Sequence, residues 1–194
     1  MGLLDTILGR SKPVRPDLDQ LFGLPSAAVT LQAGPGFTPT GEGSVCFAGV
    51  EGGAFDRIRR EVRDLLDADT GRGGVPVEFS QDSYDYTWLL SRQDPDDIPA
   101  LVNDLHAVNT LLQDGGFGPH LLCSLIGFRD ERDRVLALVY LYKRGTFYPF
   151  APVPGAHEKR DNALEIQVSG LLGDDLRIES DLSRWFPVWG APGL

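Results

Sequence analysis

Residues 121–150, LLCSLIGFRDERDRVLALVYLYKRGTFYPF, hold three apolar runs that are separated by two short polar turns. Runs of this length between turn residues are typical of strands, and such short turns join antiparallel neighbours. We predict strands over 121–128, 134–143 and 146–150 that together form a meander. The middle run is apolar on both faces, so we expect it inside the sheet with cover on each side.

The rest of the chain adds strands and helices to this meander. We predict strands over 27–32 and 44–49, a helix over 54–69, a hairpin of 76–80 and 84–92, a helix over 94–114 and a helix that begins at Asn162. Asp94 followed by Pro95 is a typical helix start, and Asn162 with Glu165 three residues later fits a capping box. Hairpins joined by helices indicate an α+β fold.

The predicted architecture is an antiparallel β-sheet (hairpin plus three-strand meander) with three main helices packed on it and a short N-terminal helical arm. We see no internal repeat or linker, so we divide the chain only into an arm, 1–15, and a single α+β domain, 16–194. Apolar residues at helical spacing identify the helix faces that we expect in the core. They are Leu18, Leu21 and Phe22 within 17–23; Phe55, Ile58, Val62, Leu65 and Leu66; Ile98, Leu101, Val102, Leu105, Val108 and Leu112; and Leu164, Val168, Leu171 and Leu172. In the tail we expect Trp185, Phe186 and Trp189 to close over the core.

Composition and charge limit the possible functions. Hydrophobic residues make up 42% and charged residues 24% of the 194 residues, which is ordinary for a folded domain. The net charge of −10 lies wholly in residues 41–194, because residues 1–40 carry three cations and three acids. A body this acidic repels nucleic acid and anionic lipid. No apolar run approaches the roughly 18 residues of a membrane-spanning helix and no signal-peptide pattern is present, so we expect a cytoplasmic protein with at most weak peripheral contact at the inner face of the membrane.

Side chains that could do chemistry are few and scattered. His106, His120 and His157 fit no spacing that would place zinc ligands on one face. The glycine groups lack the fixed spacing of phosphate-binding loops. Two acidic clusters are better explained as a helix start and a hairpin tip. These clusters are Asp94, Asp96 and Asp97, and Asp130, Glu131 and Asp133. We therefore expect no catalytic residue, no metal and no cofactor.

The opening segment, MGLLDTILGRSKPVR, combines four aliphatic residues with three cations. The aliphatic residues share one face of a helix that is too short to be stable alone. Three uses are open: N-myristoylation, contact with a membrane surface, or packing on the protein's own core or on a partner's. We predict a docking arm, which comprises Leu3, Leu4, Ile7, Leu8, Arg10, Lys12 and Arg15. A second predicted partner surface consists of Phe147, Tyr148 and Phe150, because the prolines around them stop further sheet pairing. Core packing is the alternative for two of the three.

Several stretches of the chain resemble one known family. MGLLDTILGRSKP, PDLDQLFGLPSAAVTLQ, FSQDSYDYTWLL and RWFPVWG are similar to the actinobacterial PspA-associated proteins called PspAB, and the similarity extends over the whole length. The resemblance implies a cytoplasmic protein that is linked with PspA in the phage-shock type of membrane-stress response, in some cases with a membrane zinc protease of the HtpX type. It implies no catalytic residues.

Three hypotheses follow from these observations. The leading one is a non-enzymatic adaptor that binds a PspA-like coiled-coil protein or an HtpX-type membrane protease. The second is a small-molecule or peptide-binding domain whose helix-covered sheet works like a secretion-chaperone clamp, and it predicts a concave apolar groove. The third is a cysteine-dependent enzyme that uses Cys46 or Cys123, and it requires a reactive thiol.

Overall fold

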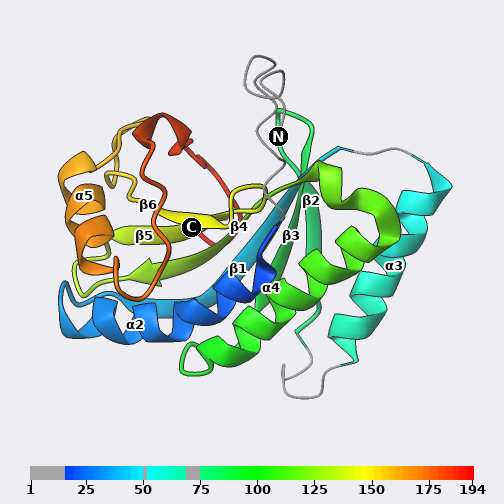
Figure 1. The fold of residues 1–194 in the computed structure, drawn as a ribbon, viewed down its shortest axis with the longest axis horizontal. Helices are drawn as coiled ribbons and strands as arrows, with labels where there is room; N and C mark the ends of the chain where they lie inside the picture. The colour runs from blue at the N-terminus through cyan, green and yellow to red at the C-terminus, as the bar shows by residue number, and fades with distance from the viewer. Residues whose placement is uncertain (1–15, 50–51, 69–74) are drawn as a thin grey trace, which may run out of the picture.

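The computed structural model describes residues 16–49, 52–68 and 75–194. These residues form an α+β fold around one six-stranded antiparallel sheet with the strand order β2-β3-β1-β4-β5-β6 (Figure 1). The strands are β1 (Thr38–Ala48), β2 (Glu78–Gln81), β3 (Tyr86–Arg92), β4 (Leu121–Arg129), β5 (Val135–Leu141) and β6 (Thr146–Phe150). The α-helices of the described residues are α2 (Leu24–Ala33), α3 (Gly53–Asp67), α4 (Ile98–Leu112) and α5 (Asn162–Leu171), and short helical turns lie at η1 (Leu18–Gly23), η3 (Gln113–Phe117), η4 (Gly118–His120) and η5 (Leu182–Arg184).

The predicted meander and hairpin are both confirmed. Strands β4, β5 and β6 pair in sequence order, and β2 pairs with β3. Strand β1 joins the two groups, because it pairs with β3 on one side and with β4 on the other. It is longer than the predicted 44–49, since it begins at Thr38. Gly41 has a φ of +79° at the register shift between Pro39 and Gly43, so a bulge lets the strand continue through this glycine- and proline-rich sequence.

One predicted strand is wrong, because residues 27–32 belong to helix α2. The sequence AAVTLQ contains β-branched residues, which favour strands. However, Leu24, Ala27 and Leu31 fall at i, i+3 and i+7, and all three are buried. Pro25 lies in the first turn of α2, where its missing N–H costs nothing, so it starts this helix rather than ending the preceding one.

The helices α2, α3 and α4 lie on one face of the sheet and enclose the larger part of the core (Figure 1). The predicted apolar stripes are buried with four exceptions: Leu18 is partly buried, and Phe22, Leu65 and Leu171 are exposed. In α3, Leu66 follows Phe55 by eleven residues, which is about three turns, so it shares the buried face while Leu65 lies to the side. Two predicted caps are displaced: Asp97 rather than Asp94 caps α4, and Asp161 rather than Asn162 caps α5.

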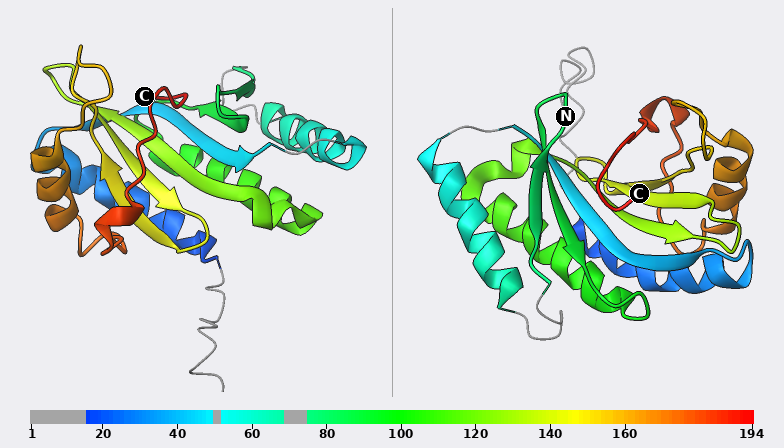
Figure 2. Two further views of the ribbon diagram at one scale, coloured as in Figure 1. Left: turned by 90° about the horizontal axis from the view of Figure 1, so that it is seen from above. Right: turned by 180° about the vertical axis from the view of Figure 1, so that it is seen from behind.

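The opposite face of the sheet carries a second, smaller core. Because successive strand residues point to opposite faces, Leu138 of β5 joins the helix side while Ala137 and Val139 join this second cluster. The C-terminal segment crosses this face, as the view from behind shows (Figure 2, right). Trp185 is buried there and Trp189 packs at its margin, as predicted, whereas Phe186 is exposed.

Strand β6 ends the sheet on one side, and the backbone of residues 177–179 is hydrogen-bonded to its outer edge. The amide of Phe147 donates to the carbonyl of Arg177 at 2.8 Å, and the carbonyl of Phe147 accepts from the amide of Glu179 at 2.8 Å. Pro149 has no N–H to offer farther along. On the other side the sheet ends with β2, which has only four residues.

Candidate functional site

An apolar groove lies on the second face of the sheet, with a volume of about 600 Å³. Its floor is a row of residues that stand directly opposite one another on four adjacent strands. This row is Trp88 of β3, Cys46 of β1, Cys123 of β4 and Leu141 of β5. The remaining lining residues are Asp82, Tyr84, Tyr86, Leu122, Lys143, Arg144, Tyr148, Arg184, Phe186, Pro187, Val188 and Trp189.

One wall of the apolar groove is the turn between β2 and β3. Asp82 organises this turn, because one carboxylate oxygen accepts from the amides of Tyr84 and Tyr86 at 2.9 and 3.0 Å. Its other oxygen accepts from Nε1 of Trp88 at 2.9 Å, which fixes the indole on the floor. Tyr84 and Tyr86 are left exposed at the mouth, with 74% and 41% of their surface accessible. A single carboxylate thus positions three aromatic residues of the groove.

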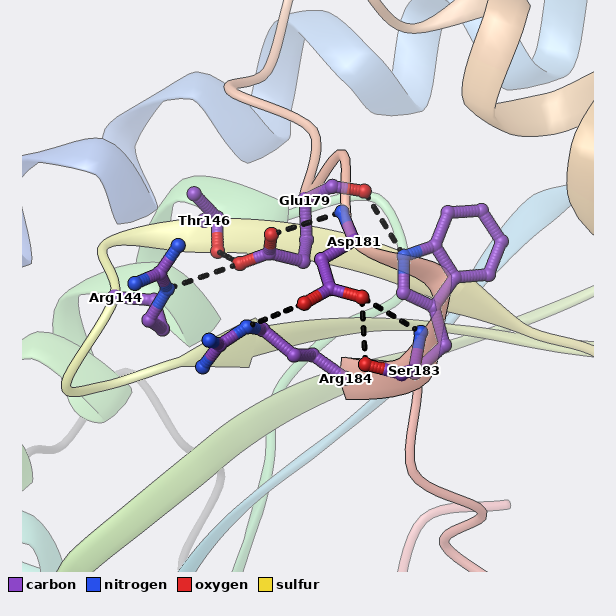
Figure 3. Close-up of polar contacts among 7 residues, drawn as sticks. Arg144, Thr146, Glu179, Asp181, Ser183 and Arg184 are labelled. Carbon is purple, nitrogen blue, oxygen red and sulfur yellow. Dashed lines mark hydrogen bonds and ion pairs between the residues drawn. The ribbon is translucent and has the colours of Figure 1, made fainter.

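The other wall is the C-terminal strap, residues 179–189, which a polar network holds against the sheet (Figure 3). Glu179 is buried, and its carboxylate accepts from Oγ1 of Thr146 at 2.9 Å and from Nε of Arg144 at 3.2 Å. It also accepts from the amide of Asp181 at 3.1 Å. Asp181 in turn accepts from Ser183 and forms an ion pair with Arg184 at 3.0 Å. Hydrogen bonds and an ion pair therefore hold the first residues of the strap against the sheet.

Farther along, the C-terminal strap is anchored to β6 and α5. Trp185 stacks on Tyr148 with ring centres 6.0 Å apart, and its indole N–H donates to the carbonyl of Glu179 at 3.0 Å. Arg160 donates from Nη1 to the carbonyl of Trp185 at 2.5 Å and pairs through Nε with Glu165 at 2.8 Å. These contacts make the strap a fixed wall of the groove.

Acid should loosen this wall. Burial opposes ionisation of Glu179, but hydrogen bonds from Asp181, Thr146 and Arg144 outweigh it and hold the pKa of Glu179 below its usual value. Bonds from Ser183 and Arg184 lower the pKa of Asp181 in the same way. Because both pKa values are lower in the folded chain, their stabilisation is present above about pH 4.5 and is lost as the pH falls through the folded values.

We therefore expect the free energy of unfolding to decrease with acidification below about pH 4.5 and tryptophan emission to shift to the red. Emission reports this region because the chain has three tryptophans, Trp88, Trp185 and Trp189, and all lie at the second core. Glu179→Gln should flatten the pH dependence. An equally steep acid transition in that variant would contradict this account.

The charges at the rim of the apolar groove are largely compensated. Arg144 is paired with Glu179 and Arg184 with Asp181. Lys143 is exposed, and none of the ion pairs among the described residues involves it. Asp82, on the opposite wall, is engaged by the turn and by Trp88. Among the described residues the groove is thus an apolar site with a cation, Lys143, that takes part in none of these ion pairs.

Comparison with known families identifies the family of this chain. A family model for PspAB, PspA associated protein B, matches residues 1–193. The chain belongs to the PspAB family. Searches of curated proteins and of solved structures find no match for it. The resemblance inferred from the sequence motifs is therefore confirmed over essentially the whole chain, and the family description indicates an accessory role in association with PspA.

The two cysteines of this PspAB chain are free and buried, and they face each other on β1 and β4. The hydrogen bond with Cys123, together with burial, raises the pKa of the Cys46 thiol far above its usual value. A nucleophilic cysteine needs a lowered pKa, because the thiolate is the reactive form. The geometry therefore disfavours Cys46 as a nucleophile and gives it a packing role on the floor of the groove.

The predicted partner-binding residues have two outcomes. Phe147, Tyr148 and Phe150 are buried, so the prediction that they form a partner surface is wrong. On the face of β6 away from the helices, Trp185 of the C-terminal strap stacks on Tyr148 and Arg160 lies over the ring of Phe150. These contacts remove the rings from the surface. The seven residues of the predicted docking arm lie outside the described residues.

The other candidate side chains have structural roles in this PspAB chain. His106 packs on the ring of Phe22 at 4.9 Å, as expected for a residue on the flank of α4. Asp130 bonds with Arg134 inside the β4–β5 turn, and Asp94 bonds with the amide of Asp96 before α4. Within 16–49, 52–68 and 75–194 no three His, Cys, Asp or Glu side chains are grouped as metal ligands. None of the helices in these ranges has the length and hydropathy to cross a membrane.

Proposed function

We propose that this protein is a non-enzymatic accessory protein whose apolar groove binds an apolar segment of a PspA-like coiled-coil partner. The observation that carries the proposal is the row Trp88, Cys46, Cys123 and Leu141, an apolar floor on four strands that the C-terminal strap borders without filling. A volume of about 600 Å³ is within the usual range of ligand pockets. The family description, PspA associated protein B, supports the choice of PspA as the partner.

Exposed aromatic residues at the mouth support a protein partner. Tyr84, Tyr86 and Phe186 are 74%, 41% and 59% exposed, and all three line the apolar groove. Tyrosine is one of the residue types enriched among those that dominate protein–protein binding energies, and aromatic side chains bury a large apolar area on contact. An amphipathic helix laid in an apolar groove is a common recognition mode, and a coiled-coil protein offers such helices.

The test is calorimetric titration of the full chain with purified PspA from the same organism. Leu122→Glu and Phe186→Glu should each weaken binding by about 30-fold, or about 2 kcal/mol, because each places a charge against an apolar partner surface. Leu122 is half-buried and Phe186 exposed, so neither change removes a fully buried side chain.

Val29→Glu is the matched control, since Val29 is 68% exposed on α2, on the other side of the sheet. It should leave the affinity within a factor of about two. Equal affinity of the groove variants and wild type would contradict the proposal. A small apolar molecule that remains bound in native mass spectra, with no PspA binding, would instead favour a small-molecule site.

A further inference from the structure

We propose that residues 3–8 of the same chain occupy the apolar groove in the free protein, so that a partner segment must displace them. The inference rests on the proposed function of the groove and adds its regulation. The occupant is identified by three observations: where the described chain begins, how far the preceding residues reach, and what chemistry they carry.

The described chain begins at the β5–β6 turn, which borders the groove. The phenol of Tyr140 donates to the carbonyl of Asp17 at 2.8 Å, which fixes Asp17 at the end of β5. A Cβ added to Gly145 would lie 3.5 Å from Cβ of Asp17, so Asp17 lies against the β5–β6 turn. Lys143 and Arg144, in the same turn, line the groove. The residues before Pro16 are therefore attached at the β5–β6 turn, on the helix side of the sheet, and two residues of this turn line the groove.

The reach of these residues is sufficient. Leu8 precedes Asp17 by nine residues, which span up to about 30 Å when extended. The groove lies on the other face of the sheet from Tyr140, and packed layers are about 10 Å apart, so the path around the turn is well within that length. A tethered segment also has an effective concentration of about a millimolar, far above that of a second copy in dilute solution.

The chemistry of the segment matches the cavity. Residues 3–8, LLDTIL, contain four aliphatic side chains and a single charge, Asp5. The floor of the groove is apolar, and its margin carries Lys143, a cation with no ion pair among the described residues. An apolar segment with one carboxylate thus finds an apolar surface and one available opposite charge.

Photocrosslinking of the full chain tests this placement without any partner present. With Ile7→p-benzoylphenylalanine, irradiation of dilute protein should join residue 7 to peptides that contain Leu122, Leu141 or Val188 within one chain. The same photoreactive residue at Val29 is the control and should give none of these products. Crosslinks to another surface, crosslinks between two chains, or no crosslink at residue 7 would each overturn the proposal.

A second measurement uses 1-anilinonaphthalene-8-sulfonate as a probe of the open groove. If the segment occupies the groove nine-tenths of the time, Leu4→Asp with Ile7→Asp should tighten dye binding about tenfold. Val29→Asp should leave it unchanged, and unchanged dye binding in the double variant would overturn the proposal. The two proposals can fail separately. If PspA does not bind but the crosslink forms, only the proposed function is refuted. If PspA binds at the groove but no crosslink forms, only the inference about residues 3–8 is refuted.

Discussion

Replacement of Glu165 by alanine should lower the free energy of unfolding by about 3–5 kcal/mol, because it leaves a buried arginine without its partner. Glu165 is buried, and its carboxylate accepts from Nε of Arg160 and from the amide of Ala151, both at 2.8 Å. The Arg160 side chain is only 18% exposed, so water does not replace the lost pairing. The Ala151 amide loses its acceptor as well.

The effect should extend to the C-terminal strap. Arg160 also donates to the carbonyl of Trp185 and lies over the ring of Phe150 at 5.1 Å, so release of Arg160 loosens both contacts. Chemical denaturation monitored by circular dichroism measures the stability, and a red shift of tryptophan emission measures the loosening. Glu131→Ala removes an exposed carboxylate in the β4–β5 turn and should change stability by less than about 0.5 kcal/mol. A loss below 1 kcal/mol in Glu165→Ala would show that Arg160 is adequately solvated without its partner.

Replacement of Trp185 by alanine should cost a similar amount, about 3–5 kcal/mol, and should remove the wall of the apolar groove. Trp185 is 7% exposed, stacks on Tyr148, and bonds through its indole to the carbonyl of Glu179. Its loss leaves a cavity over β6 and an unpaired carbonyl at the start of the C-terminal strap.

Phe186→Ala is the control within the same strap, since Phe186 is 59% exposed and should cost less than about 1 kcal/mol. Equal losses for the two variants would mean that the strap contributes no packed core. The double variant with Glu165→Ala should lose less than the sum of the single losses, because Arg160 links both residues and each change releases the same segment.

The parts of the fold that could be predicted are those in which one pattern dominates. In β5 the run VLALVYL is apolar at every position, and a run of this length between turn residues is typical of a strand covered on both faces. In α4 the buried positions repeat at helical spacing over fifteen residues, so the helix could be predicted although the residue that caps it could not. The sequence DPDD offers three aspartates before α4, and only the backbone geometry selects Asp97.

The errors arose where local preference and tertiary context disagree. Helix α2 is ten residues long and contains Val29 and Thr30, whose β-branched side chains favour strands. Its buried stripe gains its energy from packing against η1, α4 and β1, which no local pattern reveals. The partner surface at Phe147 was misplaced for a related reason, since the segment that covers β6 comes from thirty residues farther along the chain.

The apolar groove could be expected only in general terms. A helix-covered antiparallel sheet has a second face, and the sequence predicted that aromatic residues of the tail would close over the core. That Trp88, Cys46, Cys123 and Leu141 form one row depends on the registers of three strand pairings. Register is fixed by turns and bulges across the whole sheet, so a single residue of slip would have placed these side chains on the other face.

The two ends of the sheet determine how this protein meets other chains. A free strand edge offers a row of backbone donors and acceptors to which a foreign strand adds, as in β-augmentation and in amyloid growth. At the β6 edge, the backbone N–H and carbonyl of Phe147 are already bonded to Arg177 and Glu179, and Pro149 has no N–H to donate. At the other edge, β2 has only four residues, one of which is the charged Glu78. Within the described residues the backbone is thus closed to strand addition at β6 and offers little at β2, and recognition is left to side chains.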